Sequence, residues 1–139
     1  MSVDRLVKAL GEIKWGELGA CLVVLHGSAL RRANPRDIDL FIFVKGDEEE
    51  AALRAMEAVE TAAGIEADIY VASDVDHVNC FLLLEALRSG VILYKDSEGV
   101  DMLVKAVGIC NDFMISRRKV KYTETLVERA LGRVAGEAP

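Results

Sequence analysis

Two aspartates one residue apart, Asp37 and Asp39, stand at the start of an apolar, strand-forming run that ends at Val44. Side chains alternate faces along a strand, so residues i and i+2 point the same way and these two carboxylates project from one face. Neighbouring carboxylates repel and raise each other's pKa unless a cation lies between them. Mg²⁺ prefers such oxygen ligands and usually combines one or two carboxylates with substrate phosphates. The pair therefore predicts a strand that carries metal ligands.

A Gly-Ser pair, Gly27-Ser28, ends the preceding apolar run nine residues before Asp37. Glycine lets a phosphate approach the backbone, and a serine hydroxyl at a helix start can help to hold it. A phosphate cradle beside metal-binding carboxylates is typical of phosphoryl or nucleotidyl transfer. An isolated Asp-x-Asp is more often a solvated strand edge or a turn cap, so the Gly-Ser pair is what favours a catalytic interpretation.

Composition and charge limit the number of domains and the kinds of partner that we expect. The chain has 139 residues, 52% of them hydrophobic, which suits one domain with a packed core. A net charge of −6 argues against broad nucleic-acid binding but allows a nucleotide whose charge a metal carries. The longest apolar run is too short to span a bilayer and the N-terminal segment has no signal pattern. We therefore expect a cytoplasmic protein without a membrane partner.

Apolar periodicity predicts alternating helices and strands. Helical spacing covers residues 3–13 and 48–63, and strand-like runs cover 20–25, 37–44, 65–71 and 91–94. Ser73-Asp74 can cap a helix that ends at Arg88, and the chain from about Val100 is helical in pattern. The order predicts an α/β or α+β fold, with a small mixed sheet of about four strands and helices packed on one side.

These motifs carry a resemblance to a known family. The stretch from His26 to Arg31, followed by Asp37-Ile38-Asp39-Leu40, resembles the signature of the DNA polymerase beta-like nucleotidyltransferase superfamily. More narrowly, it resembles the minimal nucleotidyltransferases (MNT) of prokaryotes. That pattern has a Gly-Ser pair, an arginine three residues after the serine, an Asp-x-Asp and a third aspartate on a neighbouring strand. The third aspartate falls on Asp68, and the resemblance covers about residues 6–94.

The resemblance implies a nucleotidyltransferase-like fold and a metal-dependent transfer of NMP from an NTP to a hydroxyl acceptor, with release of pyrophosphate. ATP is the expected donor, and two Mg²⁺ ions, for which Mn²⁺ can substitute, are the expected cofactors. The implied catalytic and metal-binding residues are Asp37, Asp39 and Asp68, and the implied phosphate-binding residues are Gly27, Ser28 and Arg31.

The resemblance implies that residues 1–97 form the nucleotidyltransferase domain. The region beyond has no match in the family, and its helical pattern predicts that residues 98–139 are a C-terminal helical extension packed on the same structural domain. The resemblance also implies a partner. Members of the family often pair with a helical HEPN protein as toxin and antitoxin. A HEPN-type toxin whose tyrosine is AMPylated is therefore an expected partner, and a homodimer through the C-terminal helices is also open.

Alternatives stay open on the sequence alone. The rival function is an antitoxin-like binding module that acts by contact with little or no catalysis, which Arg36 favours because a serine or acidic residue usually stands there. Glu66 competes with Asp68 as the third carboxylate, since it precedes Asp68 by two residues on the same face. We interpret His26 as a packed strand-end histidine and the basic cluster at residues 117–121 as a solvated face rather than an RNA contact.

Overall fold

The computed structural model describes residues 2–30 and 37–131, with the side chains of residues 28 and 117–126 outside that description. The chain divides into two compact units, residues 1–107 and 108–139. The elements in chain order are α1 (Val3–Gly11), the 3-10 helix η1 (Trp15–Leu18), β1 (Ala20–His26), the 3-10 helix η2 (Gly27–Leu30), β2 (Ile38–Val44), α2 (Glu48–Ala63), β3 (Ala67–Ala72), the 3-10 helix η3 (Val75–His77), α3 (Cys80–Ser89), β4 (Val91–Lys95) and α4 (Ser97–Leu131).

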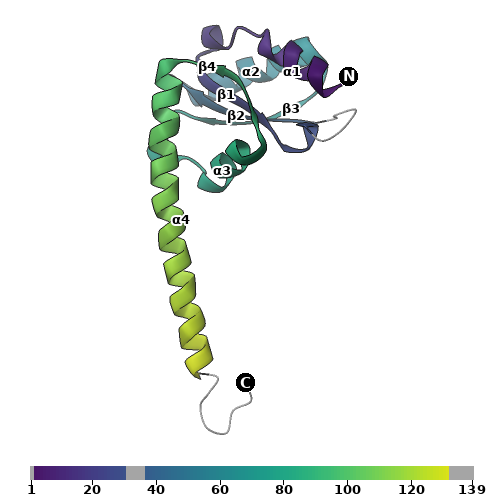
Figure 1. The fold of residues 1–139 in the computed structure, drawn as a ribbon. Coiled ribbons are helices and arrows are strands. Elements are labelled where there is room, and N and C mark those ends of the chain that lie inside the picture. Colours follow the sequence, from purple (N-terminus) through teal and green to yellow (C-terminus); the bar gives the residue numbers. More distant parts are fainter. Residues whose placement is uncertain (1, 31–36, 132–139) are drawn as a thin grey trace. The chain divides into compact units, whose positions relative to one another are not determined.

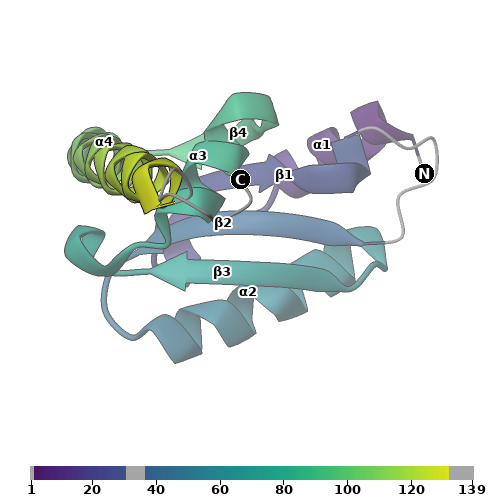
Figure 2. The same ribbon diagram turned by 90° about the horizontal axis from the view of Figure 1, so that it is seen from below.

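The first unit is built on a four-stranded sheet with the order β3-β2-β1-β4 (Figure 2). β1 is antiparallel to both β2 and β4, whereas β2 and β3 are parallel. This mixed sheet confirms the predicted fold class. Helices α1 and α2 lie on one face and α3 lies on the other (Figure 1), where the sequence predicted helices on one side only. Apart from His26 and Asp39, β1 and β2 are apolar on both faces, so both faces need a cover that excludes water.

The main hydrophobic core lies between the sheet and helices α1 and α2. It contains Leu6 and Leu10 of α1, inward-facing residues of β1 and β2, and Val59 of α2, all fully buried. Trp15 closes one side, and its indole Nε1 donates a hydrogen bond to the carbonyl oxygen of Leu10 at 2.9 Å. Every residue of β1 is buried, as the continuous apolar run predicted. These buried central strands adjoin the polar residues described below.

Local capping explains why α2 lies where the sequence predicted it. The Asp47 side chain accepts a hydrogen bond from the backbone N–H of Glu50 at 3.1 Å, and the glutamates of the first turn favour the positive end of the helix dipole. Gly64 ends the helix with a φ of 66°, in the left-handed region that suits glycine. Both ends of α2 therefore follow from short-range chemistry.

The segment after β3 differs from the prediction of one helix starting at Ser73-Asp74. Asp74 accepts a hydrogen bond from the backbone N–H of Asp76 at 2.9 Å, which closes the short helix η3 instead. The chain then restarts as α3, for which Asn79 is the N-cap and accepts from the Leu82 N–H at 3.2 Å. Because Asp74 caps η3 and Asn79 caps α3, the helix that ends near Arg88 begins later than the sequence predicted.

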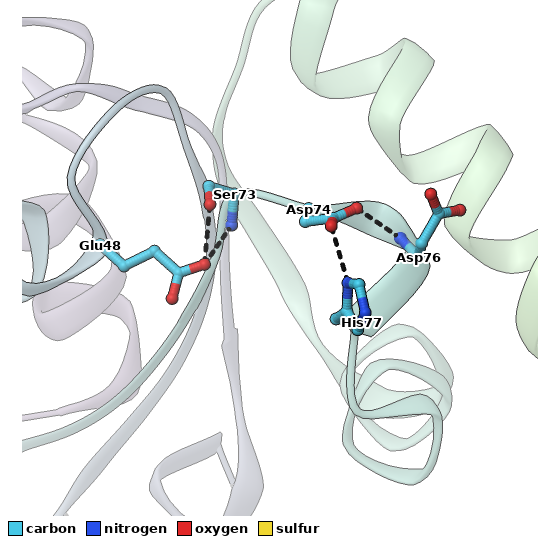
Figure 3. A network of polar contacts seen from close by, with 5 residues as sticks. All are labelled: Glu48, Ser73, Asp74, Asp76 and His77. Carbon is cyan, nitrogen blue, oxygen red and sulfur yellow. Dashed lines mark hydrogen bonds and ion pairs between the residues drawn. The ribbon is translucent and has the colours of Figure 1, made fainter.

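A polar network secures the C-terminal end of β3 (Figure 3). Glu48 Oε1 accepts hydrogen bonds from the backbone N–H of Ser73 at 2.9 Å and from its hydroxyl at 2.8 Å, which lowers the pKa of Glu48. Beside it, His77 Nδ1 lies 2.7 Å from Asp74 Oδ2. This contact raises the pKa of His77, while the Asp76 N–H and His77 together lower the pKa of Asp74. The network ties α2 to the end of β3.

The C-terminal region is one helix, α4, in place of the several helices that the pattern suggested. Its start is held by Asp96, whose side chain accepts from the Gly99 N–H at 2.8 Å, and by an ion pair of 2.6 Å between Lys45 and Glu98. Across residues 2–30 and 37–131, no helix combines the length and apolar character needed to cross a bilayer. The packing of residues 98–139 on the nucleotidyltransferase-like domain stays a prediction.

The start of α4 approaches β1 so closely that only glycine fits at position 99. A Cβ on Gly99 would stand 2.5 Å from the carbonyl carbon of Cys21 and 3.1 Å from the amide nitrogen of Leu22. We expect Gly99→Ala to destabilise the protein by about 1–3 kcal/mol because backbone atoms cannot move aside. Gly108→Ala is the matched control in the same helix, with no atom within 4 Å, and should stabilise by about 0.5–1 kcal/mol. Urea unfolding followed by circular dichroism checks both, and equal stability of the two variants would contradict the close approach.

The His77–Asp74 contact makes a pH prediction. Because the pKa of His77 is raised above its ordinary 6.5, the contact stabilises the fold below pH 6.5 and this contribution is lost as the pH rises through the folded pKa of His77. At the acid end it is lost as the pH falls through the lowered pKa of Asp74. An NMR titration should show His77 titrating above 6.5 in the wild type and closer to 6.5 in Asp74→Asn. A wild-type value at or below 6.5 would refute the contact.

Candidate functional site

The carboxylates that the sequence singled out meet on β2 and β3. The parallel register pairs Asp39 with Asp68, and paired residues on adjacent strands share a face about 4.8 Å apart. Asp37, one residue before β2, lines the same pocket of about 270 Å³, together with Glu66 and Ala67. The structure therefore brings the predicted carboxylates into one pocket, on the sheet face that α3 covers.

The carboxylates in this pocket carry like charges and repel one another. Burial raises the pKa of Asp39 above its ordinary 3.8, and the carboxylates of Asp68 and Asp37 raise it further. The imidazole of His26, opposite Asp39 in the β1–β2 register, acts the other way and lowers that pKa. A pocket of repelling carboxylates is one that a cation would stabilise.

The donor set suits a hard divalent cation. Among the described residues, the charged groups that line the pocket are all carboxylates, which Mg²⁺ and Mn²⁺ favour over nitrogen or sulfur ligands. Within the part of the chain that the structure describes, no three His, Cys, Asp or Glu side chains converge tightly enough to form a complete metal site. Mg²⁺ does not need one, because it keeps several waters and takes substrate phosphates as ligands. Asp37, Asp39 and Asp68 are the residues that would hold it.

Gly27 lies directly against the carboxylate of Asp39. Gly27 follows β1 with a φ of 82°, and a Cβ there would stand 3.1 Å from Cγ of Asp39 and closer still to its carboxylate oxygen. Glycine is therefore required both by the backbone conformation and by the space that Asp39 occupies. The side chain of Ser28 and the whole of Arg31, both predicted to bind phosphate, lie outside the described residues.

His26, which the sequence favoured as a packed residue, and Tyr70, for which it predicted no role, both lie next to this site. His26 is only 6% exposed, so it is packed as predicted. It also lines a small cavity of about 50 Å³ with Asp39, Asp68 and Tyr70, under Leu82 of α3. The Tyr70 hydroxyl accepts a hydrogen bond from the Asn79 N–H at 2.7 Å, which links β3 to the start of α3. Two features of the sequence could have indicated this proximity. Tyr70 follows Asp68 by two residues on the same strand face, and His26 directly precedes Gly27.

Comparisons with known proteins identify the fold. No family model matches the chain, and no curated protein matches its sequence. A solved toxin–antitoxin complex with AMP-PNP contains a similar chain, with a TM-score of 0.58, 15% identity, and coverage of 90% of this chain and 99% of that one. A complex of tri-AMPylated Shewanella oneidensis HEPN toxin with MNT antitoxin gives a TM-score of 0.56, 16% identity and coverages of 84% and 97%.

The toxin–antitoxin pair MntA-HepT also contains a similar chain, with a TM-score of 0.54, 14% identity and coverages of 88% and 96%. At identities this low, the likeness speaks for the fold alone. The chain therefore has the fold of the minimal nucleotidyltransferase antitoxins, as the motif resemblance predicted.

The contact between Gly27 and Asp39 can be tested with two alanine variants. Gly27→Ala and Gly46→Ala place a side chain at nearly the same positive φ, 82° and 83°, but Gly46 has no atom within 4 Å. The left-handed conformation should cost each variant about 1–2 kcal/mol in urea unfolding. Only Gly27→Ala should also weaken Mn²⁺ binding, measured by electron paramagnetic resonance, because Asp39 must move. Equal Mn²⁺ affinity in the two variants would argue against a role for this contact.

Proposed function

We propose that this protein is a metal-dependent nucleotidyltransferase that transfers NMP from an NTP to a hydroxyl acceptor and releases pyrophosphate. The observation that carries the proposal is the shared pocket of Asp37, Asp39 and Asp68 beside the Gly27 turn. Carboxylates that hold a cation next to a turn that admits a phosphate are the two parts that this chemistry requires. The fold shared with minimal nucleotidyltransferases supports the same conclusion.

Each residue has a defined part in the proposed reaction. Asp37 and Asp39 would hold Mg²⁺, two ions in the proposal, from the start of β2. Asp68 would complete the site from β3 and help to take the proton of the acceptor hydroxyl. When bound, the metal would supply electrostatic stabilisation of the charge that develops on the phosphoryl group. Gly27 lets the phosphates approach the backbone, and Ser28 and Arg31 bind them. The pyrophosphate then leaves and the NMP stays on the acceptor.

The solved complexes suggest the donor and the acceptor. One contains AMP-PNP, and another joins an MNT antitoxin to a HEPN toxin that carries three AMP groups. We extend this to the present chain: ATP is the donor, and a hydroxyl of a HEPN-type toxin, most simply a tyrosine, is the acceptor. AMPylation of that partner would be the antitoxin activity.

Calorimetric titration of ATP, GTP, CTP and UTP, with and without Mg²⁺, tests the site. We expect Mg²⁺-dependent ATP binding in the wild type and a loss of about a hundredfold or more in Asp37→Asn/Asp39→Asn. The double variant Asp4→Asn/Asp101→Asn removes the same charge from exposed helical positions and should bind like the wild type. If the wild type binds none of the four nucleotides, the catalytic proposal fails.

A second test separates catalysis from neutralisation by contact. The protein is mixed with a HEPN-type toxin and ATP labelled at the α-phosphate, and both label transfer and toxin activity are measured. Catalysis predicts that Asp37→Asn/Asp39→Asn still binds the toxin but neither labels nor neutralises it. Full neutralisation by the double variant would establish the contact mechanism instead.

A further inference from the structure

Helix α2 presents an acidic and partly apolar face to solvent. Leu53 is 62% exposed and Met56 46% exposed, and glutamates stand before and after them on the same side of the helix. These exposed glutamates are Glu49, Glu50, Glu57 and Glu60. Arg54 is the one basic residue in the α2 sequence, and it pairs with Glu50 at 2.6 Å. Large apolar side chains grouped on a surface in this way are typical of an interaction site.

A groove of about 410 Å³ adjoins this acidic face. Glu57 lines it, together with apolar side chains from α2 and from the segment between α1 and β1. The apolar side chains are Ile13, Leu18, Ala58 and Ala62. Among the described residues, Glu57 and Glu60 form no ion pair. Because α2 covers the sheet face opposite α3 (Figure 1), the groove is separate from the carboxylate pocket and calls for a partner that is both apolar and basic.

The same chain carries a segment of complementary chemistry in α4. Four of the 17 lysines and arginines lie within residues 117–121, although the net charge is −6. Exposed apolar side chains flank this stretch, with Ile115 44% and Val127 53% exposed. Residues 115–127 contain four basic side chains and one acidic, whereas α2 contains five acidic and one basic. Helical residues 115–127 span about 20 Å and α2 about 24 Å, so the two segments match in length and are opposite in charge.

We propose that residues 115–127 of one copy of this chain dock on the acidic face of α2 in a second copy. Each copy carries one basic and one acidic surface, so reciprocal exchange pairs both and closes as a two-fold dimer. Opposite charges select the partner surface, and burial of Leu53 and Met56 against apolar side chains of α4 supplies affinity. A stable dimer buries about 1,600 Å² in total, which two equivalent contacts would share. This inference does not depend on the proposed catalytic function.

Sedimentation velocity of the full-length protein over a range of concentrations tests the contact. The wild type should sediment with twice the mass of a monomer at low salt. In 1 M NaCl the dissociation constant should rise by about tenfold or more, because charges are then screened beyond about 3 Å. Glu57→Lys/Glu60→Lys reverses the charge of α2, and Lys119→Glu/Lys121→Glu reverses that of α4. Each double variant alone should raise the dissociation constant by about tenfold or more, since like charges then face one another.

An equimolar mixture of the two reversed variants is the sharpest measurement. In a mixed dimer, the reversed α2 meets the reversed α4 and the natural α2 meets the natural α4, so both contacts are attractive again. The mixture should therefore recover the dissociation constant of the wild type. Asp4→Lys/Asp101→Lys makes the same change of charge at exposed positions outside both surfaces, and it should dimerise like the wild type.

Three results would overturn the proposal. They are a wild type that stays monomeric, a dimer that the reversal of α2 leaves unchanged, and a mixture of the reversed variants that stays monomeric. A monomeric wild type that binds a HEPN-type toxin less tightly after the reversal of α2 would assign this face to that partner instead. If circular dichroism shows that a reversed α2 is misfolded, Glu57→Gln/Glu60→Gln takes its place, and unchanged dimerisation of that variant would equally refute the contact.

Discussion

The parallel pairing of β2 with β3 is the constraint on which the rest of the site depends. It places Asp39 beside Asp68 and carries Asp37 and Glu66 into the same pocket. A slip of one residue would turn Asp68 to the opposite face. The register is held by the other face, where alternate residues of β2 and β3 pack against α2, and by Glu48, which binds Ser73 at the far end of β3. Packing on one face therefore positions the acidic side chains on the other.

The buried central strands also explain the electrostatics of Asp39 and its neighbouring carboxylates. Central strands β1 and β2 are buried almost throughout, so Asp39 is partly withdrawn from water and its pKa is raised. Its near neighbours are a glycine with no side chain, a buried histidine and further carboxylates. Such a site gains stability when it binds a cation, which is the property that nucleotidyl transfer requires. The same arrangement would be a burden in a protein that acts by surface contact only.

Fold and function rest on different observations in this protein. The likeness to solved toxin–antitoxin structures has an identity of 13–16% and establishes the architecture. Folds host many activities, so the activity has to be argued from the residues of the site. Those residues are present here at positions that the register brings together, and the proposed activity rests on them. The partner and the acceptor remain inferences from the solved complexes.

The sequence by itself determined the local features. Helical periodicity predicted α2, the apolar runs predicted the strands, and the Asp-x-Asp and Gly-Ser motifs predicted the site. Only the tertiary structure decided that helices cover both faces of the sheet and that Glu66, His26 and Tyr70 join or adjoin the pocket. Capping and alternation act over a few residues and can be recognised in one segment. Strand order, register and the choice of face arise from contacts between distant segments, which no single segment encodes.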